Sequence, residues 1–336
     1  MDKYLTVCLV NEIYDLKETD FVDINENISL RKASEVDLDL LKGHIELFQE
    51  SFYNLWTNYF ENEITLSNDK LNPKTNKLEK EKHRYTILQY DKFPLSDQEL
   101  ISLKLSDLNL NILIQKGFEL TDNKEMELKE DGETIFKRDF LTSYNSLIDT
   151  QNKFNLYGSK KYLRKKPTKS VLVNYNKTLE QVTSIYNSEG DFGIIIKALE
   201  DYIELDRISN ESPFKLVNYF SLIESLITHN PKSEYGNSIS KQLSNKIEFL
   251  YNNFLKDFDF KDYFKGPDSN TINTIINLLY NYRSDIAHGN IPKFHKELKI
   301  VQQNIDNVLP FMEALLRQIL KYSISKPSLI LDLKRC

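Results

Sequence analysis

Asn281-Tyr-Arg-Ser-Asp-Ile-Ala-His-Gly289 closes a segment that has the spacing of a buried helix. The apolar residues before it recur three and four positions apart, on one helical face: Ile272, Ile275, Ile276 and Leu279. Arg283 comes four positions after Leu279, so it continues the apolar stripe instead of the solvated face. A guanidinium keeps its charge and is rarely buried without a partner, so this position needs a chemical explanation.

The residues after Arg283 predict the end of this helix. Gly289 can cap a helix in the left-handed conformation, and Pro292 shortly after it cannot continue one. His288 precedes this glycine directly. We therefore expect Arg283 on the buried face of the last turn and His288 at the frayed end of the same helix.

The sequence from about residue 166 onwards predicts helices joined by short connections. Ser212-Pro213 is a helix start signal, with a capping serine and a proline at the first helical position. The expected helices cover residues 191–208, 213–228, 238–254, 271–287 and 294–322, the last of them broken or kinked at Pro310. Five such helices predict an up-and-down bundle.

Residues 1–165 predict a mixed region instead. Strands are expected at 5–10, 23–30, 84–90 and 110–114, and helices at 34–59, after the capping residue Ser96, and at 138–154. Trp56 lies on the apolar stripe of the first of these helices and is assigned to the core. A mobile loop is expected at 67–82 and a charged turn at 124–133. The fold class is thus an α+β N-terminal domain (1–165) followed by an all-α helical bundle (166–336).

Composition restricts the classes of partner. The chain of 336 residues carries a net charge of −6, so its surface as a whole does not attract nucleic acid. A nucleic-acid contact would need a local basic patch, and the densest candidate is the cluster of Lys161, Arg164, Lys165 and Lys166. The same cluster is also typical of a solvated linker.

The number of cysteines and the length of the apolar segments indicate in which cellular compartment the protein is expected. Cys8 and Cys336 are the only cysteines, so no disulfide framework is implied. No apolar run approaches the roughly 18 residues that a membrane span needs. The histidines form no metal-ligand pattern, and no metal or other cofactor is expected. We expect a cytoplasmic protein that does not associate with membranes.

Glu224 is the carboxylate that the spacing singles out. It follows Phe220 by four positions and Val217 by seven, within or beside the apolar stripe of the helix at 213–228. A carboxylate directed into a bundle that also holds Arg283 predicts a salt bridge between the two. That salt bridge could serve catalysis, or it could only neutralise the arginine in the fold.

The segment Arg283-Ser-Asp-Ile-Ala-His288 resembles the R-x(4–6)-H motif of HEPN ribonucleases, which lies near the end of a bundle helix. The phrase from Tyr282 to Gly289 looks most like the ApeA-like branch found in bacterial antiphage systems. That branch tends to carry an acidic residue in an earlier helix, and Glu224 matches it in kind. The resemblance covers about residues 170–325. Many family nucleases have asparagine after the arginine, where this chain has Ser284, a shorter hydrogen-bonding residue.

This resemblance implies metal-independent cleavage of RNA, in which a ribose 2′-hydroxyl attacks the adjacent phosphorus. Histidine suits proton transfer near neutral pH, so His288 is the expected general acid and base. Arginine presents a planar fork that matches phosphate oxygens, so Arg283 is expected to stabilise the transition state. Asp285 or Glu224 would orient one of them, and Ser284 would contact the substrate.

The family further implies a homodimer with two motifs facing one cleft, because one histidine per chain is few for two proton transfers. The N-terminal domain would then be a regulator or sensor, with a phage-derived trigger as its expected partner. The full expectation is an abortive-infection ribonuclease effector. Two alternatives remain open: a non-catalytic HEPN-like interaction module, and the toxin of a toxin–antitoxin pair whose partner is a nucleotidyltransferase.

Overall fold

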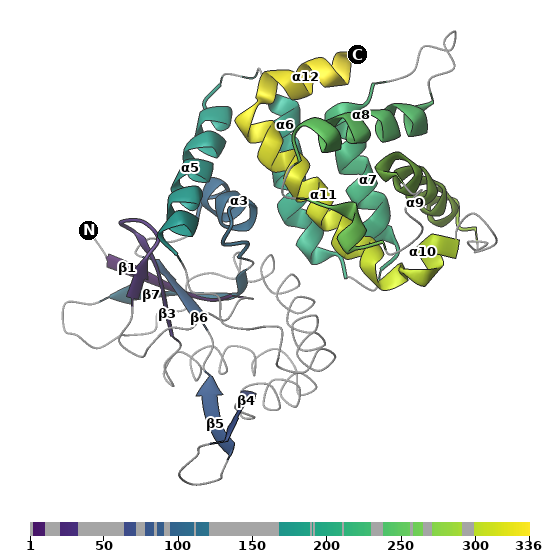
Figure 1. Cartoon of the computed structure of the whole chain (residues 1–336). Coiled ribbons are helices and arrows are strands. Elements are labelled where there is room, and N and C mark those ends of the chain that lie inside the picture. Colours follow the sequence, from purple (N-terminus) through teal and green to yellow (C-terminus); the bar gives the residue numbers. More distant parts are fainter. Residues whose placement is uncertain are drawn as a thin grey trace. The chain divides into compact units, whose positions relative to one another are not determined.

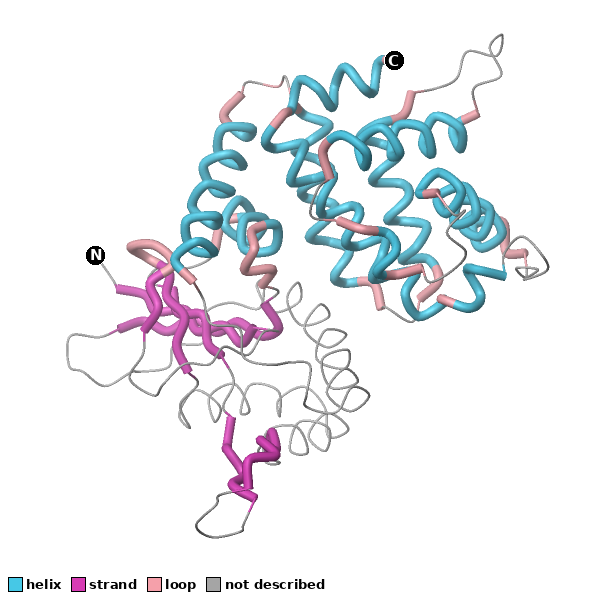
Figure 2. Tube along the Cα trace, viewed as in Figure 1, coloured by secondary structure: helices cyan, strands magenta, loops and turns pink. Residues whose placement is uncertain are grey.

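The chain forms two compact units in the computed structural model, residues 1–177 and 178–336 (Figure 1). The structure describes residues 3–10, 21–32, 64–71, 78–83, 86–90, 95–110, 112–120, 168–188, 190, 192–209, 212–229, 238–255, 258–264, 271–290 and 299–336. Strands lie in the first unit and helices fill the second (Figure 2). The predicted order of an α+β region followed by a helical region is therefore confirmed.

The first unit contains a five-stranded antiparallel sheet in the order β2-β3-β6-β1-β7. Its strands are β1 (Lys3–Val10), β2 (Phe21–Asp23), β3 (Ile28–Lys32), β6 (Thr86–Tyr90) and β7 (Ile112–Leu120). In β6 the successive residues Ile87 and Leu88 are both fully buried, although they point to opposite faces. The sheet is therefore covered on both faces at its middle strand.

The helix predicted after Ser96 is α3 (Asp97–Leu105). Ser96 and Glu99 form a capping box, in which each side chain accepts a hydrogen bond from the other's backbone amide. Both oxygens of the Glu99 carboxylate also accept from the hydroxyl of Tyr90, at 2.9 and 2.8 Å. The start of α3 is thus attached to the end of strand β6.

Two predictions for the first unit are wrong. The strand expected at 23–30 is two strands, β2 and β3, because the Asn25 side chain accepts from the amides of Asn27 and Ile28 and turns the chain back. The loop expected at 67–82 is instead largely a hairpin of β4 (Ile64–Leu71) and β5 (Leu78–His83). The two strands pair through their backbone groups, so their polar side chains do not prevent the pairing.

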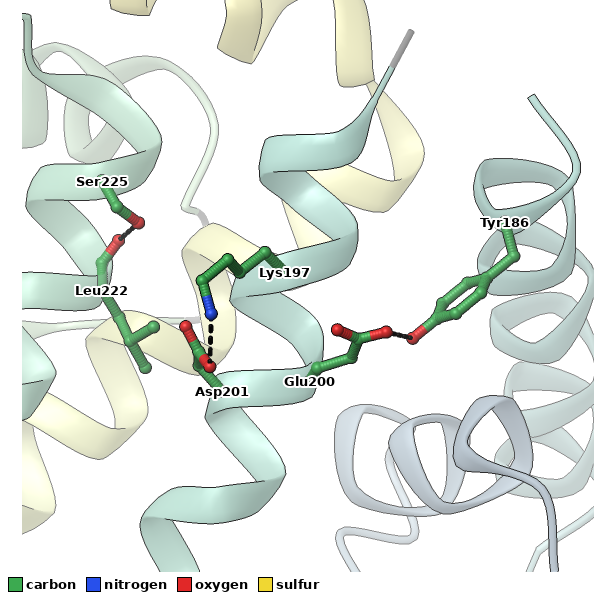
Figure 3. A network of polar contacts seen from close by, with 6 residues as sticks. All are labelled: Tyr186, Lys197, Glu200, Asp201, Leu222 and Ser225. Carbon is green, nitrogen blue, oxygen red and sulfur yellow. Dashed lines mark hydrogen bonds and ion pairs between the residues drawn. The ribbon is translucent and has the colours of Figure 1, made fainter. Parts of the chain in front are cut away.

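The division between the units falls inside α5 (Lys169–Tyr186), beyond the domain boundary predicted at 165. The first half of α5 belongs to the sheet unit. There Asn174 accepts from the amide of Asp107, Asn176 donates to the carbonyl of Ile24, and the Tyr175 ring is fully buried. The second half belongs to the helical unit, where Tyr186 donates to Glu200 at 3.4 Å (Figure 3).

The helical unit is built around α7 (Phe214–Ile227). This helix contacts α6 (Gly193–Glu204), α8 (Ile239–Asn253), α9 (Ile272–Ala287), α11 (Ile305–Ser325) and α12 (Pro327–Arg335), an arrangement that Figure 1 shows. Its length is apolar on most sides, with Phe220, Ile223, Leu226 and Ile227 fully buried. A helix that is apolar nearly all round belongs at the centre of a bundle.

The contact between α8 and α9 is polar along one side. Asn273 donates to Asn245 and to Glu248, each at 3.1 Å, and Asn277 accepts from Ser240 at 3.1 Å. The apolar residues of the stripe that contains Leu279 lie on the other side and are buried. Directional hydrogen bonds to α8 and apolar packing together fix the rotation of α9, and with it the direction of Arg283.

Four of the five predicted helices correspond to α6, α7, α8 and α9 within a few residues. The helix predicted at 294–322 is divided at Asn304 into α10 (Lys299–Gln303) and α11. Because α11 runs on through Pro310, the break predicted there is wrong, and the kink given as the alternative stays a prediction. α5 and α12 had no individual prediction. No helix in the described part of the chain is long and apolar enough to cross a membrane.

The helices expected at 34–59, including Trp56, and at 138–154, and the turn expected at 124–133, lie outside the described residues. The same holds for the basic cluster of Lys161, Arg164, Lys165 and Lys166. These remain predictions from sequence.

Candidate functional site

The candidate site lies at the C-terminal end of α9, where the chain ends the helix as the sequence predicts. Gly289 has a φ of +68°, which is the left-handed conformation that favours glycine. Its amide donates to the carbonyl of Ile286 and the amide of Asn290 donates to the carbonyl of Asp285. These two bonds form a Schellman motif, and His288 is the cap residue.

Arg283 projects from the last turn of α9 towards α7, where it meets Glu224. One guanidinium nitrogen, Nη2, lies 3.5 Å from Oε1 of Glu224, and the two side chains are only 20% and 18% exposed. The predicted salt bridge is therefore present. At this distance it is an electrostatic contact and not a strong hydrogen bond, and Arg283 Nε and Glu224 Oε1 are buried without a hydrogen bond from the described protein atoms.

An aromatic pair supports the same guanidinium. The Arg283 Cζ atom lies 5.4 Å from the centre of the Tyr280 ring, within cation–π range. Tyr280 in turn packs edge-to-face on Phe220, with ring centres 5.7 Å apart. Because Phe220 and Glu224 are one turn apart on α7, that helix holds the guanidinium both directly and through the tyrosine.

Burial shifts the pKa values of the acidic groups next to the guanidinium. Desolvation raises the pKa of Glu224, and the Arg283 guanidinium opposes this rise by favouring the ionised carboxylate. Desolvation also raises the pKa of Tyr280, with a further rise from the Glu224 charge. Taking the carboxylate out of water is thus the larger effect at Glu224, and Arg283 compensates for only part of it.

His288 is on a different side of the helix from Arg283. Five residues correspond to a rotation of about 140° and a rise of about 7.5 Å in a helix. His288 is exposed, whereas Arg283 is largely buried, and the described residues show no hydrogen bond or ion pair between the two. Within one chain, the arginine and the histidine therefore share a helix end but not a contact.

The other candidate residues in this segment lie between these two. Ser284 and Asp285 are half-buried, and their carbonyls accept the cap hydrogen bonds from His288 and Asn290. The described residues show no ion pair that joins the Asp285 carboxylate to Arg283, and the carboxylate that contacts the guanidinium is that of Glu224.

Sequence reasoning missed Tyr280. It lies three positions before Arg283, a spacing that places the two side chains on neighbouring parts of one helical face. That spacing was the available signal. The described residues contain no group of three or more His, Cys, Asp or Glu side chains placed to hold a metal ion.

A scan against protein-family models finds no match, and searches of curated proteins and of solved structures find none either. The resemblance to HEPN ribonucleases therefore rests on the residues quoted above.

Proposed function

We propose that the helical unit is an endoribonuclease module in which Arg283 binds the scissile phosphate and His288 transfers protons. The observation that supports this is a largely buried guanidinium, oriented by Glu224 and Tyr280, on the last turn of a helix whose exposed cap is a histidine. A helix C-terminus carries a negative partial charge, so a phosphate there must be held by cationic side chains. Arg283 and His288 are side chains of that kind.

The proposed reaction uses the ribose itself as nucleophile. His288 removes the proton from the 2′-hydroxyl and the oxygen attacks phosphorus. The imidazolium formed in this way then gives the proton to the 5′ oxygen of the next nucleotide, and the bond between phosphorus and that oxygen breaks. Arg283 neutralises the negative charge that accumulates on the phosphoryl oxygens. The products are a 2′,3′-cyclic phosphate and a free 5′-hydroxyl.

The separation of Arg283 and His288 favours a site completed by a second copy of the chain. The described residues show no contact between the two side chains within a chain, so a second copy can supply the histidine that faces Arg283. In the homodimer that we propose, Arg283 of one copy and His288 of the other act on one phosphate.

The first experiment is cleavage of purified total RNA in EDTA, with end analysis of the products. We expect wild-type cleavage with cyclic phosphate ends, and a loss of about a hundredfold or more for His288→Ala and for Arg283→Ala. Asn281→Ala changes an exposed residue of the same helix and is the control for α9. An RNA with a 2′-deoxy substitution at the cut position should resist cleavage.

A mixing experiment tests the shared site. Arg283→Ala and His288→Ala proteins are each inactive, but in a mixed dimer one interface site keeps both functional residues. Partial recovery on mixing supports the dimer, whereas equal inactivity of the mixture and of each variant contradicts it.

The buried ion pair also favours a second candidate function, a non-catalytic interaction module in which Arg283 and Glu224 only hold α9 on α7. In that case wild-type protein would not cleave RNA, and variants at either position would unfold. Folded but inactive variants of an active parent separate the two proposals.

We further propose that the sheet unit regulates the nuclease in antiphage defence. The reason for this proposal is the order of the two units, since a mixed α+β unit precedes a bundle whose activity would be toxic. Deletion of residues 1–165 should alter toxicity or the response to phage infection. Unchanged toxicity and unchanged response would remove this proposal.

A further inference from the structure

The last turn of α7 carries Glu224 and is bound by two lysines from other helices. Four carbonyls at a helix C-terminus lack a partner inside the helix and need one from elsewhere. The carbonyl of Ser225 accepts from Nζ of Lys334 on α12, and that of Ile227 accepts from Nζ of Lys246 on α8, at 2.9 Å. Positive charge here also opposes the negative end of the helix dipole.

Lys334 contacts this turn through its side chain and also through its backbone carbonyl. Its side chain reaches the Ser225 carbonyl, and its own carbonyl lies 3.1 Å from Nδ1 of His229, just beyond the end of α7. A carbonyl oxygen can only accept, so Nδ1 of His229 carries the proton in this contact. The set of Ser225, His229 and Lys334 is called the α7–α12 contact below.

The contact joins two helices through the side chain of Lys334 and through its backbone carbonyl. The hydroxyl of Ser225 bonds back to the Leu222 carbonyl at 2.8 Å (Figure 3), so the Ser225 carbonyl is the group offered to Lys334. Lys246 is buried and Lys334 is half-buried, and this burial lowers the pKa of both ammonium groups. A charge is withdrawn in this way only where its hydrogen bonds offset the desolvation.

Glu224 depends on the same turn. Its carbonyl accepts both the amide and the hydroxyl of Thr228, at 2.9 and 2.8 Å, so opening of the turn would release the backbone that carries its carboxylate. The distance of 3.5 Å to Arg283 leaves no hydrogen bond that would hold the pair on its own. The carboxylate is therefore placed mainly by its helix.

We propose that Lys334 is a positioning residue for the Glu224–Arg283 pair, and that α12 sets the geometry of the candidate site through the α7–α12 contact. The consequence for catalysis rests on the proposed ribonuclease function. The structural part does not, because it can be measured at Glu224 without any RNA.

The test compares the full-length wild-type chain with Lys334→Met, which removes the ammonium but keeps most of the stem. Hydrogen exchange of the amides at 224–229 should become faster by about tenfold, as expected for the loss of a hydrogen bond from a charged donor. The pKa of Glu224, followed by carboxyl carbon-13 NMR, should fall towards its ordinary value because water reaches the loosened turn. Lys334→Arg keeps the donor and the charge and should restore both values towards wild type.

The matched control is Arg335→Met at the neighbouring position, because the ion pair recorded for Arg335 is with Asp332 on its own helix. Equal exchange rates and equal Glu224 pKa values in Lys334→Met and Arg335→Met would overturn the proposal. If Lys334→Met does not fold, His229→Ala removes the other half of the contact. It should then accelerate the same amides, and unchanged exchange would overturn the proposal in that case.

A second experiment tests whether the α7–α12 contact affects catalysis. If wild type cleaves RNA, Lys334→Met should lower kcat several-fold and displace the acidic limb of the pH profile in the same direction as the Glu224 pKa. Arg335→Met should do neither. If wild type does not cleave RNA, the proposed function fails, while the exchange and NMR results still decide the role of Lys334.

Discussion

The Arg283–Glu224 pair should be worth more to stability than the exposed pairs of the same unit. Arg283→Met removes the guanidinium and leaves the largely buried Glu224 carboxylate uncompensated. Breaking a buried pair from one side costs about 3–5 kcal/mol, and we expect about 1–3 kcal/mol because both groups retain some exposure. Urea unfolding followed by circular dichroism measures this loss.

The control is the ion pair of Lys197 and Asp201, which lie one turn apart on α6 (Figure 3). Nζ of Lys197 is 3.1 Å from Oδ1 of Asp201. The Lys197 side chain is 74% exposed, so Lys197→Met should change the free energy of unfolding by less than about 0.5 kcal/mol. Equal losses for Arg283→Met and Lys197→Met would contradict the view that the buried pair stabilises the fold more than an exposed pair does.

The raised pKa of Glu224 predicts the sign of a pH effect. A carboxyl group with a higher pKa in the folded state binds more protons there, so its contribution to stability is fully present at acidic pH. That contribution is lost as pH rises from about 4.3, the ordinary glutamate value, through the raised pKa of the folded state. The wild-type chain should therefore lose stability relative to Glu224→Gln over this window, as measured by urea unfolding at a series of pH values. An opposite slope would show that Arg283 outweighs desolvation.

For single residues, the sequence predicted those contacts that depend only on the helical face on which a residue lies. Spacing placed Arg283 and Glu224 on buried stripes, and a buried cation needs an anion, so their contact could be expected. The ring of Tyr280 over the guanidinium depends on side-chain rotamers and on Phe220 across the interface. Spacing alone does not determine those.

At the scale of the element, the Schellman motif at the end of α9 predicts an unequal response of two glycines. Gly289→Ala places a side chain at a φ of +68° and should destabilise the chain by about 1–2 kcal/mol, although no atom lies within 4 Å of the added carbon. Gly193→Ala, at the start of α6, has the same open space without the positive φ and should be neutral or slightly stabilising. Thermal unfolding of both variants checks this. Equal midpoints would show that the helix end adapts freely.

Helix boundaries in the helical unit were predicted within a few residues, but the cap predicted at Ser212 is wrong, because Pro213 is the N-cap of α7 and no side chain caps that helix. Thr271 and Ser238 cap α9 and α8, and each side chain accepts a hydrogen bond from the third backbone amide after it. The hairpin of β4 and β5 was missed because strand pairing uses backbone groups, so its polar residues show no periodic pattern. β2 and β3 were merged because a single side chain, Asn25, makes the turn between them.

For the whole molecule, the boundary between the units could not be read from composition. The cluster of basic residues before Pro167 suggested a linker near 165, whereas the compact units divide at 177 within a continuous helix. Local sequence does not show which of two cores a helix serves. The buried side chains of α5 fall in both units: Tyr175 lies in the part that belongs to the sheet unit, and Val182 and Ile185 lie in the part that belongs to the helical unit.

This division predicts that the sheet unit needs the first half of α5 to be stable. A fragment of residues 1–178 keeps the buried ring of Tyr175 and the hydrogen bonds of Asn174 and Asn176, whereas a fragment of residues 1–165 loses all three. Removal of a buried aromatic ring costs about 3–5 kcal/mol, which corresponds to a fall of about 6–20 °C in the midpoint of thermal unfolding for a domain of this size. We expect at least that difference between the two fragments. In the longer fragment, Tyr175→Ala should reproduce most of the loss, and Val173→Ala, at a side chain 66% exposed, should not. Equal midpoints for all four proteins would mean that α5 serves the helical unit alone.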